Sequence, residues 1–418
     1  MDLSGFHELL SSTGQRALAD ATALAPTEAG YLAAFEKLRK RHAAELARSA
    51  LETVLLRTRA REKHSLADRL YFTREALEQS SSEAVSRHRA ERFRAYPTVL
   101  DLCCGVGIDA IHLALAGCRV EAIDSDLLRL AMAEANAAAA GVGDRVRFHL
   151  GDVLSMVLPQ AEAAFVDPSR RDGEHRFLNP SRYQPPLGSV LARFPAGFPF
   201  GAKIAPGVAR NDLDTAIVDV TLRVTKPHAE REGYDLAEVE FISSAGELKE
   251  CVLWFGPLKS VSRRATLLPN HTLAADNPPP DPTADAIREF LFDPDSSVIR
   301  AGLVGLLAEQ LDAVAVDFGI AVLTGSKPVH SPFAACYSVE RSLPFKVETL
   351  REALRERGVG RVTILKRAVD VDVNAVLKKL KLTGSVHRHV MLTRSLGQVT
   401  AIVCDNSWMR SPSGWSSP

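Results

Sequence analysis

The feature that most constrains the fold is an apolar run followed at once by glycines and a helical pattern. Residues 99–117 have the sequence VLDLCCGVGIDAIHLALAG. The apolar opening predicts a buried strand, and IDAIHLALA has apolar residues at helical spacing. Gly105 and Gly107 lie between the two, where a tight turn needs residues that tolerate positive φ. We therefore expect a strand, a turn and a helix, the repeating unit of a parallel α/β sheet.

The sequence that follows repeats this alternation. After TVLDLCC come the short apolar runs RVEAID, RVRFHL, AAFVD and GAKIA, and helical stretches separate the first four of these five runs. Such alternation predicts a parallel sheet covered by helices on both faces. Residues 237–257 differ, because two strand patterns flank residues 244–246 and predict an antiparallel hairpin.

The chain is too long for a single domain of ordinary size, with 418 residues. Shifts in pattern divide it into five expected parts, which are a helical N-terminal region (1–95), an α/β core (96–268), a linker with an acidic connecting segment (269–335), a small α+β domain (336–405) and a disordered tail (406–418). The linker assignment rests on the Pro- and Asp-rich stretch AADNPPPDPTAD, which is typical of a loop.

Charge and cysteine content limit the partners, metal sites and cellular locations that we expect for the chain. Lys+Arg and Asp+Glu both number 51, so net charge predicts no polyanionic partner. Residues 340–400 nevertheless carry 13 Lys/Arg against 6 Asp/Glu, which predicts a basic surface that could bind phosphates. None of the six cysteines forms a CxxC pair, so we expect reduced thiols and no metal site. With no signal peptide or membrane span in the pattern, we expect a cytoplasmic protein.

Asp101 bears on the ligand that the glycine turn would hold. The turn fits the loose G-x-G-x-x-A fingerprint of dinucleotide sites, in which a pyrophosphate meets the helix N-terminus. A carboxylate at the end of the preceding strand would repel that anion, and a buried carboxylate needs donors or a cation. Asp101 therefore favours a cationic ligand, although a turn that only packs remains an alternative.

These residues resemble the first motif of the class I S-adenosylmethionine-dependent methyltransferases, D/E-x-G-x-G-x-G. The matching positions are Asp101, Cys103, Gly105 and Gly107, with Cys103 in place of the first glycine. S-adenosylmethionine carries an ammonium and a sulfonium and no phosphate, which suits Asp101. The resemblance implies that these four residues contact the cofactor and that Cys103 adds bulk near its methionine moiety.

Two further carboxylates follow in the family's order. Asp124 ends RVEAID, and the resemblance implies that it accepts both ribose hydroxyls; Asp152, in HLGDV, would contact the adenine amine. The alternatives are a helix cap at Asp124 and a turn residue at Asp152. The hairpin at 237–257 resembles the family's closing strands six and seven. The resemblance covers residues 96–268 and implies a Rossmann-like, seven-stranded core.

The stretch FVDPSRRD supplies the expected acceptor site. It resembles the D/N-P-P-Y/F motif of methyltransferases that act on nitrogen, in which the carboxylate and a proline-fixed carbonyl align the target amine. Asp167 and Pro168 match, whereas Ser169 and Arg170 replace the second proline and the aromatic residue. We take Asp167 as the candidate hydrogen-bond acceptor and weak base. Arg170 and Arg171 would pair with a substrate anion or with nearby acidic side chains.

Two stretches, YFTREALEQSSSEAVSRHRAERF (71–93) before the core and VDPSRRD within it, stand in a chain with a helical N-terminal region and a small basic C-terminal domain. Together they resemble the bacterial methyltransferases with a C-terminal THUMP-like domain, which implies an RNA substrate. The place after the fifth strand, where some RNA methyltransferases carry a nucleophilic cysteine, is KIAPGV, so we expect direct transfer. Lys203 in that stretch is a substrate contact or, more simply, a lysine at a strand end. The leading hypothesis is methylation of a base nitrogen in structured RNA. Alternatives are a small-molecule or protein methyltransferase, a non-catalytic RNA-binding protein, and a disfavoured nicotinamide dehydrogenase.

Overall fold

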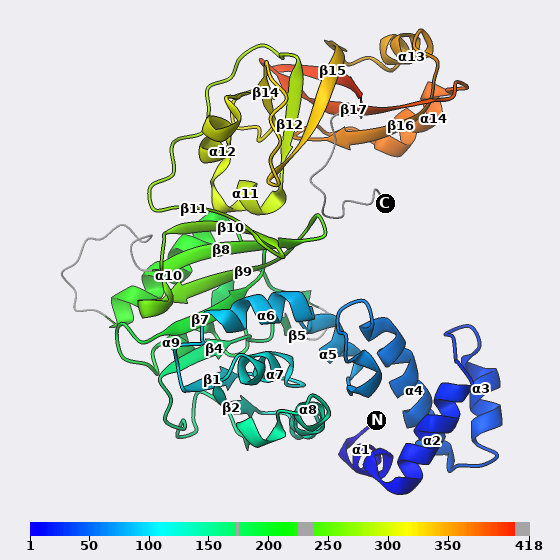
Figure 1. Ribbon diagram of the computed structural model, residues 1–418, viewed down its shortest axis with the longest axis vertical. Coiled ribbons are helices and arrows are strands. Elements are labelled where there is room, and N and C mark those ends of the chain that lie inside the picture. Colours follow the sequence, from blue (N-terminus) through cyan, green and yellow to red (C-terminus); the bar gives the residue numbers. More distant parts are fainter. Residues whose placement is uncertain (173–174, 225–236, 406–418) are drawn as a thin grey trace. The chain divides into compact units, whose positions relative to one another are not determined.

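The computed structural model describes residues 1–172, 175–224 and 237–405 (Figure 1). They form two compact units. The first contains Met1–Glu238 and Cys251–Ser260, and the second contains Val239–Glu250 and Val261–Pro418. The tail expected to be disordered, residues 406–418, lies outside the described residues. Within the described part of the chain, no helix combines the length and the apolar character needed to cross a membrane.

The first unit begins with helices, as the sequence predicted. These are α1 (Leu3–Leu10), α2 (Ser12–Ala23), α3 (Tyr31–Leu38), α4 (Ala44–Ala60), the 3-10 turn η1 (Ala67–Arg69), α5 (Arg74–Gln79) and α6 (Glu83–Glu91). Three of these helices have an N-cap residue whose side chain accepts a hydrogen bond from an N–H group of the first turn. The N-caps are Asp2 for α1, Ser11 for α2 and Thr73 for α5.

The α/β core follows in the same unit. Its elements are β1 (Thr98–Leu102), α7 (Ile108–Leu115), β2 (Arg119–Asp124), α8 (Leu127–Ala139), η2 (Gly143–Arg145), β3 (Val146–Leu150), β4 (Ala163–Val166), β5 (Arg171–Asp172), β6 (His175–Arg176), η3 (Pro180–Arg182), α9 (Leu187–Leu191), β7 (Phe200–Ile204), α10 (Arg210–Val224) and η5 (Gly256–Leu258). The strand order is β9-β7-β4-β1-β2-β3, parallel except for β9 (Glu247–Phe255), which runs antiparallel to β7. Every residue of β4 and β7 is buried, as expected where helices cover both faces of a parallel sheet.

The hairpin predicted at residues 237–257 is present as β8 (Ala237–Ser244) and β9. Its two turn residues, Ala245 and Gly246, have φ values of +51° and +79°, which suit a two-residue hairpin turn. The hairpin is divided between the two units. In the second unit the strand order is β11-β10-β8-β9, with β10 (Arg263–Leu268) and β11 (His271–Ala275). The seven expected strands are β1–β4 and β7–β9, and β10 and β11 are additional to them.

A second sheet has the order β13-β14-β12-β15-β18-β17-β16, in which only β16 and β17 pair in parallel. Its unit contains β12 (Phe290–Pro294), α11 (Ser296–Ala301), α12 (Val304–Leu311), β13 (Val314–Ala315), β14 (Leu323–Gly325), β15 (Ala334–Pro344), α13 (Val347–Arg355), β16 (Val359–Lys366), α14 (Val373–Leu380), β17 (Val386–Ser395) and β18 (Gln398–Asp405). Apolar residues of α13 and α14, among them Leu350 and Leu380, share a core with Val390 and Leu392 of β17.

Residues 269–335 are therefore more than the expected linker and acidic segment, since they hold strands β11 to β14 and two helices. β12 lies inside the sheet, between β14 and β15, and its Phe292 is fully buried. The acidic residues that suggested a solvated segment have structural partners. Asp293 accepts two hydrogen bonds of 3.0 Å from Arg367, and the Asp295 side chain caps α11.

The N-terminal helices of the first unit are packed onto the core of that unit. Their apolar cluster includes Val106 and Ile108 from the glycine turn and Met132 from α8. Asn136 of α8 is fully buried and adds a polar link. It accepts a hydrogen bond from the backbone N–H of Tyr71 (2.7 Å) and donates to the carbonyl oxygens of Tyr71 (2.9 Å) and Val106 (3.0 Å). The helical region and the turn are thus one packed structure.

Candidate active site

A cavity of about 650 Å³ lies at the carboxyl ends of β1, β2, β3 and β4 in the first unit. Open α/β sheets place their ligands at this edge. The residues that line it come after β1 (103–106, 108 and 109), β2 (124–126 and 129), β3 (151–154) and β4 (167–170), from α5 and the turn behind it (75, 76 and 78–81), and from residues 184–186. The cavity brings together eight of the ten site residues predicted from sequence, all except Asp101 and Gly107.

The glycine turn has the backbone shape that its sequence predicted. Cys103 has φ of +63°, so it adopts the left-handed conformation that the family motif leaves to glycine, at a cost of about 1–2 kcal/mol. Gly105, at φ +55°, faces open space, because a Cβ built there meets no atom within 4 Å. Gly107 serves packing instead: its Cβ would lie 2.9 Å from the Cβ of Ala133 in α8. That explains why Gly107 is absent from the cavity lining.

Asp124 is held rigidly at the edge of the cavity. Its Oδ2 accepts a hydrogen bond from the Gly105 N–H (2.8 Å) and its Oδ1 accepts one from the Asp126 N–H (2.9 Å). Each carboxylate oxygen keeps a second lone pair, so both can accept from a diol. The alternative role of helix cap belongs to Asp126, whose Oδ1 accepts from Leu128 and Arg129 of α8.

Asp152 has the turn role that was weighed for it, and its contact with adenine stays a prediction. Its Oδ1 accepts a hydrogen bond from the Leu154 N–H at 2.9 Å, which shapes the turn after β3. The residue is exposed and lines the cavity, next to Val153 and Leu154. An aromatic ring placed there would meet apolar side chains with a carboxylate at its edge.

Asp101 lies near the end of β1 and is buried, as the sequence predicted. It is 1% exposed, so it has almost no surface with which to touch a ligand, and it is not a lining residue. Its Oδ2 is buried and has no hydrogen-bond partner among the described residues. Burial, together with the neighbouring carboxylates of Asp109 and Asp167, raises the pKa of Asp101 well above its usual value. Contact between Asp101 and the cofactor therefore stays a prediction.

The acceptor stretch lines the cavity as predicted. The Asp167 side chain is 23% exposed, and its Oδ2 accepts a hydrogen bond from the Lys203 Nζ at 2.6 Å. Pro168 is buried. Ser169 pairs with Gln184 through two backbone hydrogen bonds, of 3.0 and 2.9 Å, and its N–H is the donor of the first. A proline at 169, as in the family motif, would lack that donor, which accounts for the serine.

Arg170 also lines the cavity. Its Nη1 is buried and has no hydrogen-bond partner within the described part of the chain. A buried guanidinium nitrogen without an acceptor is costly, so this atom is available to an oxygen of a ligand. The side chain of Arg171, predicted to share this role, lies outside the described residues.

Comparison with known proteins identifies the family. Over 367 residues the chain is 33% identical to an uncharacterized S-adenosylmethionine-dependent methyltransferase of Mycobacterium tuberculosis (strain ATCC 25618 / H37Rv), covering 85% of this chain and 96% of the relative. This chain belongs to the S-adenosylmethionine-dependent methyltransferases. The methyltransferase also shares 35% identity over 141 residues with the release factor glutamine methyltransferase of Chlorobaculum tepidum, 30% of this chain and 47% of that one.

Parts of the methyltransferase match known families. Residues 96–171 match the RNA cap guanine-N2 methyltransferase family, residues 334–406 match the THUMP domain-like family, and residues 2–60 match a domain of unknown function. Its fold is similar to the crystal structure of a Porphyromonas gingivalis W83 protein assigned as a methyltransferase, with a TM-score of 0.68 at 18% identity, over 91% of this chain and 99% of that one. The expected fold class, enzyme class and cofactor are confirmed.

The cavity fits S-adenosylmethionine. Its described lining carries seven carboxylates, Glu75, Glu78, Asp109, Asp124, Asp126, Asp152 and Asp167, against two arginines, Arg129 and Arg170. Arg89 and Lys203, outside the lining, pair with Asp109 and Asp167, so seven negative charges face four positive ones. This excess of negative charge attracts a ligand with a sulfonium and an ammonium and repels a pyrophosphate. Burial, with the carboxylates of Asp124 and Asp167, raises the pKa of the Cys103 thiol well above its usual value, so this thiol of the cavity lining is neutral.

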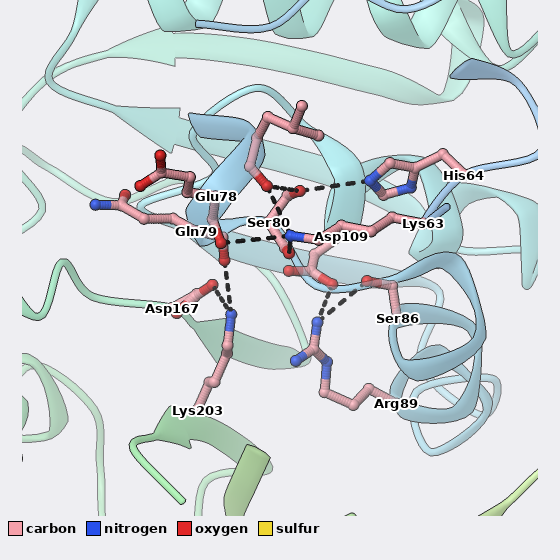
Figure 2. A network of polar contacts seen from close by, with 11 residues as sticks. Lys63, His64, Glu78, Gln79, Ser80, Ser86, Arg89, Asp109, Asp167 and Lys203 are labelled. Atoms are coloured by element: carbon pink, nitrogen blue, oxygen red, sulfur yellow. Dashed lines mark hydrogen bonds and ion pairs between the residues drawn. The ribbon is translucent and has the colours of Figure 1, made fainter. Parts of the chain in front are cut away.

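Sequence reasoning gave little weight to Lys203, and it did not foresee the segment after α5. Lys203 is 3% exposed and donates to Asp167 and, at 3.4 Å, to the carbonyl oxygen of Gln79 (Figure 2). The available signal was a lysine in FGAKI, a strand with no other polar side chain, because a buried lysine requires a partner. The segment after α5 carries no comparable signal, since its contribution comes from backbone carbonyls and from its place beside the core.

Proposed function

We propose that this methyltransferase transfers a methyl group directly to a nitrogen of a base in structured RNA, with an exocyclic amine as the favoured acceptor. The observation that carries the proposal is the carboxylate of Asp167 at the cavity, with one oxygen bound by Lys203. When bound, S-adenosylmethionine supplies an electrophilic methyl group on a sulfonium sulfur. The chain must then orient a nitrogen lone pair toward that carbon and accept the proton that the nitrogen gives up.

The contacts of Asp167 support both tasks. Its Oδ2 is occupied by the Lys203 ammonium, so the remaining oxygen can accept an N–H hydrogen bond from the target amine. Such a bond fixes the direction of the lone pair, an orientation effect that accounts for much of the rate in transfer reactions. The same carboxylate is our candidate for the weak base that receives the proton. Direct transfer needs no nucleophile from the chain, consistent with the neutral Cys103 thiol.

Support for RNA comes from two parts of the chain. The core matches a family named for methylation of guanine N2 in RNA, and the second unit contains the THUMP domain-like match. Residues 340–400 have a large excess of Lys and Arg, as expected for a surface that binds phosphates. The unpartnered Nη1 of Arg170 could donate to a carbonyl or phosphate oxygen of the substrate. A protein amide nitrogen is the second candidate, because the match to the release factor enzyme covers part of the core.

The test is a transfer assay with radiolabelled S-adenosylmethionine. Unmodified transcripts of structured bacterial RNAs and bacterial protein extracts are offered separately, and labelled RNA is digested to nucleosides for mass spectrometry. We expect a methylated base from the RNA and none from protein. The variant D167A should bind the cofactor within about threefold of wild type by calorimetry and lose at least tenfold in turnover. Label in protein alone would exclude RNA as substrate, and full activity of D167A would place the acceptor site elsewhere.

A further inference from the structure

We propose that Lys203 is a positioning residue that fixes the Asp167 carboxylate and ties it to the turn after α5, so that the N-terminal helical region forms part of the acceptor site. This proposal rests on the proposed function, because it concerns how Asp167 is held during transfer. Lys203 lies in β7, and Asp167 follows β4, the strand paired with β7. Its ammonium donates to Asp167 Oδ2 at 2.6 Å and to the Gln79 carbonyl oxygen at 3.4 Å (Figure 2).

Lys203 acts through Asp167 and not on the substrate. It is 3% exposed and does not belong to the described cavity lining, whereas Asp167 does. A buried ammonium beside a carboxylate holds that carboxylate in one rotamer through a short, charge-assisted hydrogen bond. With Oδ2 engaged in this way, a single oxygen of Asp167 faces an incoming amine, which removes the choice between two acceptor positions.

Two lysines, Lys63 and Lys203, donate hydrogen bonds to backbone carbonyls of α5 and the turn after it. Lys63, which follows α4, donates to the carbonyl oxygens of Leu77 (2.8 Å), Glu78 (3.4 Å) and Ser80 (3.2 Å). These are carbonyls at the end of α5, where helices lack internal partners and lysines are favoured. Figure 2 shows the two ammonium groups approaching this turn, Lys63 from the helical region and Lys203 from the sheet. The turn itself lines the cavity, so its position sets the shape of the acceptor site.

The surrounding charges keep this arrangement in place. Asp109, which also lines the cavity, forms an ion pair with the buried Arg89. Burial raises the pKa of Asp109, but the cations of Arg89 and Lys203 outweigh that effect and lower it below its usual value. Arg89 also donates to Ser86 and lies over the ring of Phe165 in β4. Lys203 therefore lies between two carboxylates, and its charge is compensated within the site.

The decisive variants are K203M, which keeps the length of the stem and removes the ammonium, and K203R, which restores a cation. We expect K203M to lower kcat on the RNA acceptor at least tenfold, with the KM for RNA and the cofactor Kd within threefold of wild type. K203R should recover a large part of the loss. The double variant D167A/K203M should be no slower than D167A alone, because a positioning residue has nothing left to position.

A second measurement needs no substrate. Hydrogen exchange followed by mass spectrometry should show faster exchange for residues 77–82 in K203M than in wild type, because the tie to Gln79 is lost. The matched control is R147M, which removes another ion pair of the first unit, that of the exposed Arg147 with Glu121. It should leave exchange at residues 77–82 and kcat unchanged. The double variant D167A/K203M also covers the case in which K203M alone folds poorly, since it removes both members of the ion pair.

The outcomes separate this inference from the proposed function. A kcat for K203M within twofold of wild type, or losses in K203M and D167A that multiply in the double variant, would overturn the positioning role. Unchanged exchange at residues 77–82 would overturn the tie to the N-terminal region. If the wild type methylates no RNA, the proposed function fails. The exchange measurement still tests whether Lys203 holds the turn after α5 through Gln79.

Discussion

Replacing Asn136 with alanine should destabilise the first unit and weaken cofactor binding together. Asn136 is fully buried and makes three hydrogen bonds to backbone groups, two to Tyr71 and one to Val106 of the glycine turn. Alanine removes all three at once. Each buried backbone group left without a partner costs about 1–3 kcal/mol, so we expect a loss of about 3–9 kcal/mol in the free energy of unfolding. That is a large share of the stability of a typical domain, about 5–15 kcal/mol.

The effect on the cofactor follows from the bond to Val106. That carbonyl belongs to the turn whose Gly105 N–H holds Asp124, so a looser turn should move the carboxylate expected to bind ribose. We expect the Kd for S-adenosylmethionine to rise at least tenfold in N136A. N136D is the matched variant: it still accepts from Tyr71, but its second oxygen cannot donate to the two carbonyls. It should lose nearly as much stability as N136A.

Urea unfolding followed by circular dichroism gives the stability, and calorimetry gives the affinity. The control is N211A, at an exposed position in α10, which should stay within about 0.5 kcal/mol of wild type. A loss below about 1 kcal/mol in N136A would refute the hydrogen-bond reasoning. Lost stability with an unchanged Kd would show that the turn does not depend on Asn136.

Three further predictions concern single residues. Burial and the nearby Lys63 lower the pKa of His64 from 6.5 to about 4, so the unfolded chain takes up a proton that the folded chain does not. The free energy of unfolding should therefore fall by about 3 kcal/mol from this residue as pH drops from 6.5 to 4, and H64F should show a flatter pH profile in urea titrations. The raised pKa of Cys103 keeps its thiol protonated, so iodoacetamide should modify it at pH 8 much more slowly than it modifies glutathione, as mass spectrometry would show; equal rates would contradict this. G107A should unfold at lower urea because its Cβ meets Ala133, whereas G105A should mainly weaken cofactor binding in calorimetry because its Cβ enters open space; the reverse pattern would show that their roles are exchanged.

Features with a local signal were predictable from sequence. The strand, glycine turn and helix at residues 99–117 and the hairpin at 237–257 depend on neighbouring residues, and both are present. The gathering of Asp124, Asp152 and Asp167 at one edge followed from the rule that parallel strands end together.

The errors arise where distant residues meet. No local pattern could pair Lys203 with the carbonyl of Gln79, which lies 124 positions earlier in the chain. Asp101 was expected to touch the cofactor because it precedes the glycines; the structure leaves it 1% exposed, and that contact stays a prediction. In residues 269–335 the charge count outweighed the short apolar run of β12, because the ion pair of Asp293 with Arg367 cannot be read from composition.

Val106 and Ile108 belong to two structures at once. They pack in the apolar cluster of the N-terminal helices and also line the cavity. Occupancy of the cavity is therefore linked to the integrity of the helices, and a ligand at one hundred times its Kd adds about 2.7 kcal/mol to the folded state. Resistance of the N-terminal helices to protease should rise with cofactor concentration. An unchanged digestion rate would show that cofactor binding does not stabilise these helices. The cavity residues thus make the cofactor a part of what holds the N-terminal helices folded.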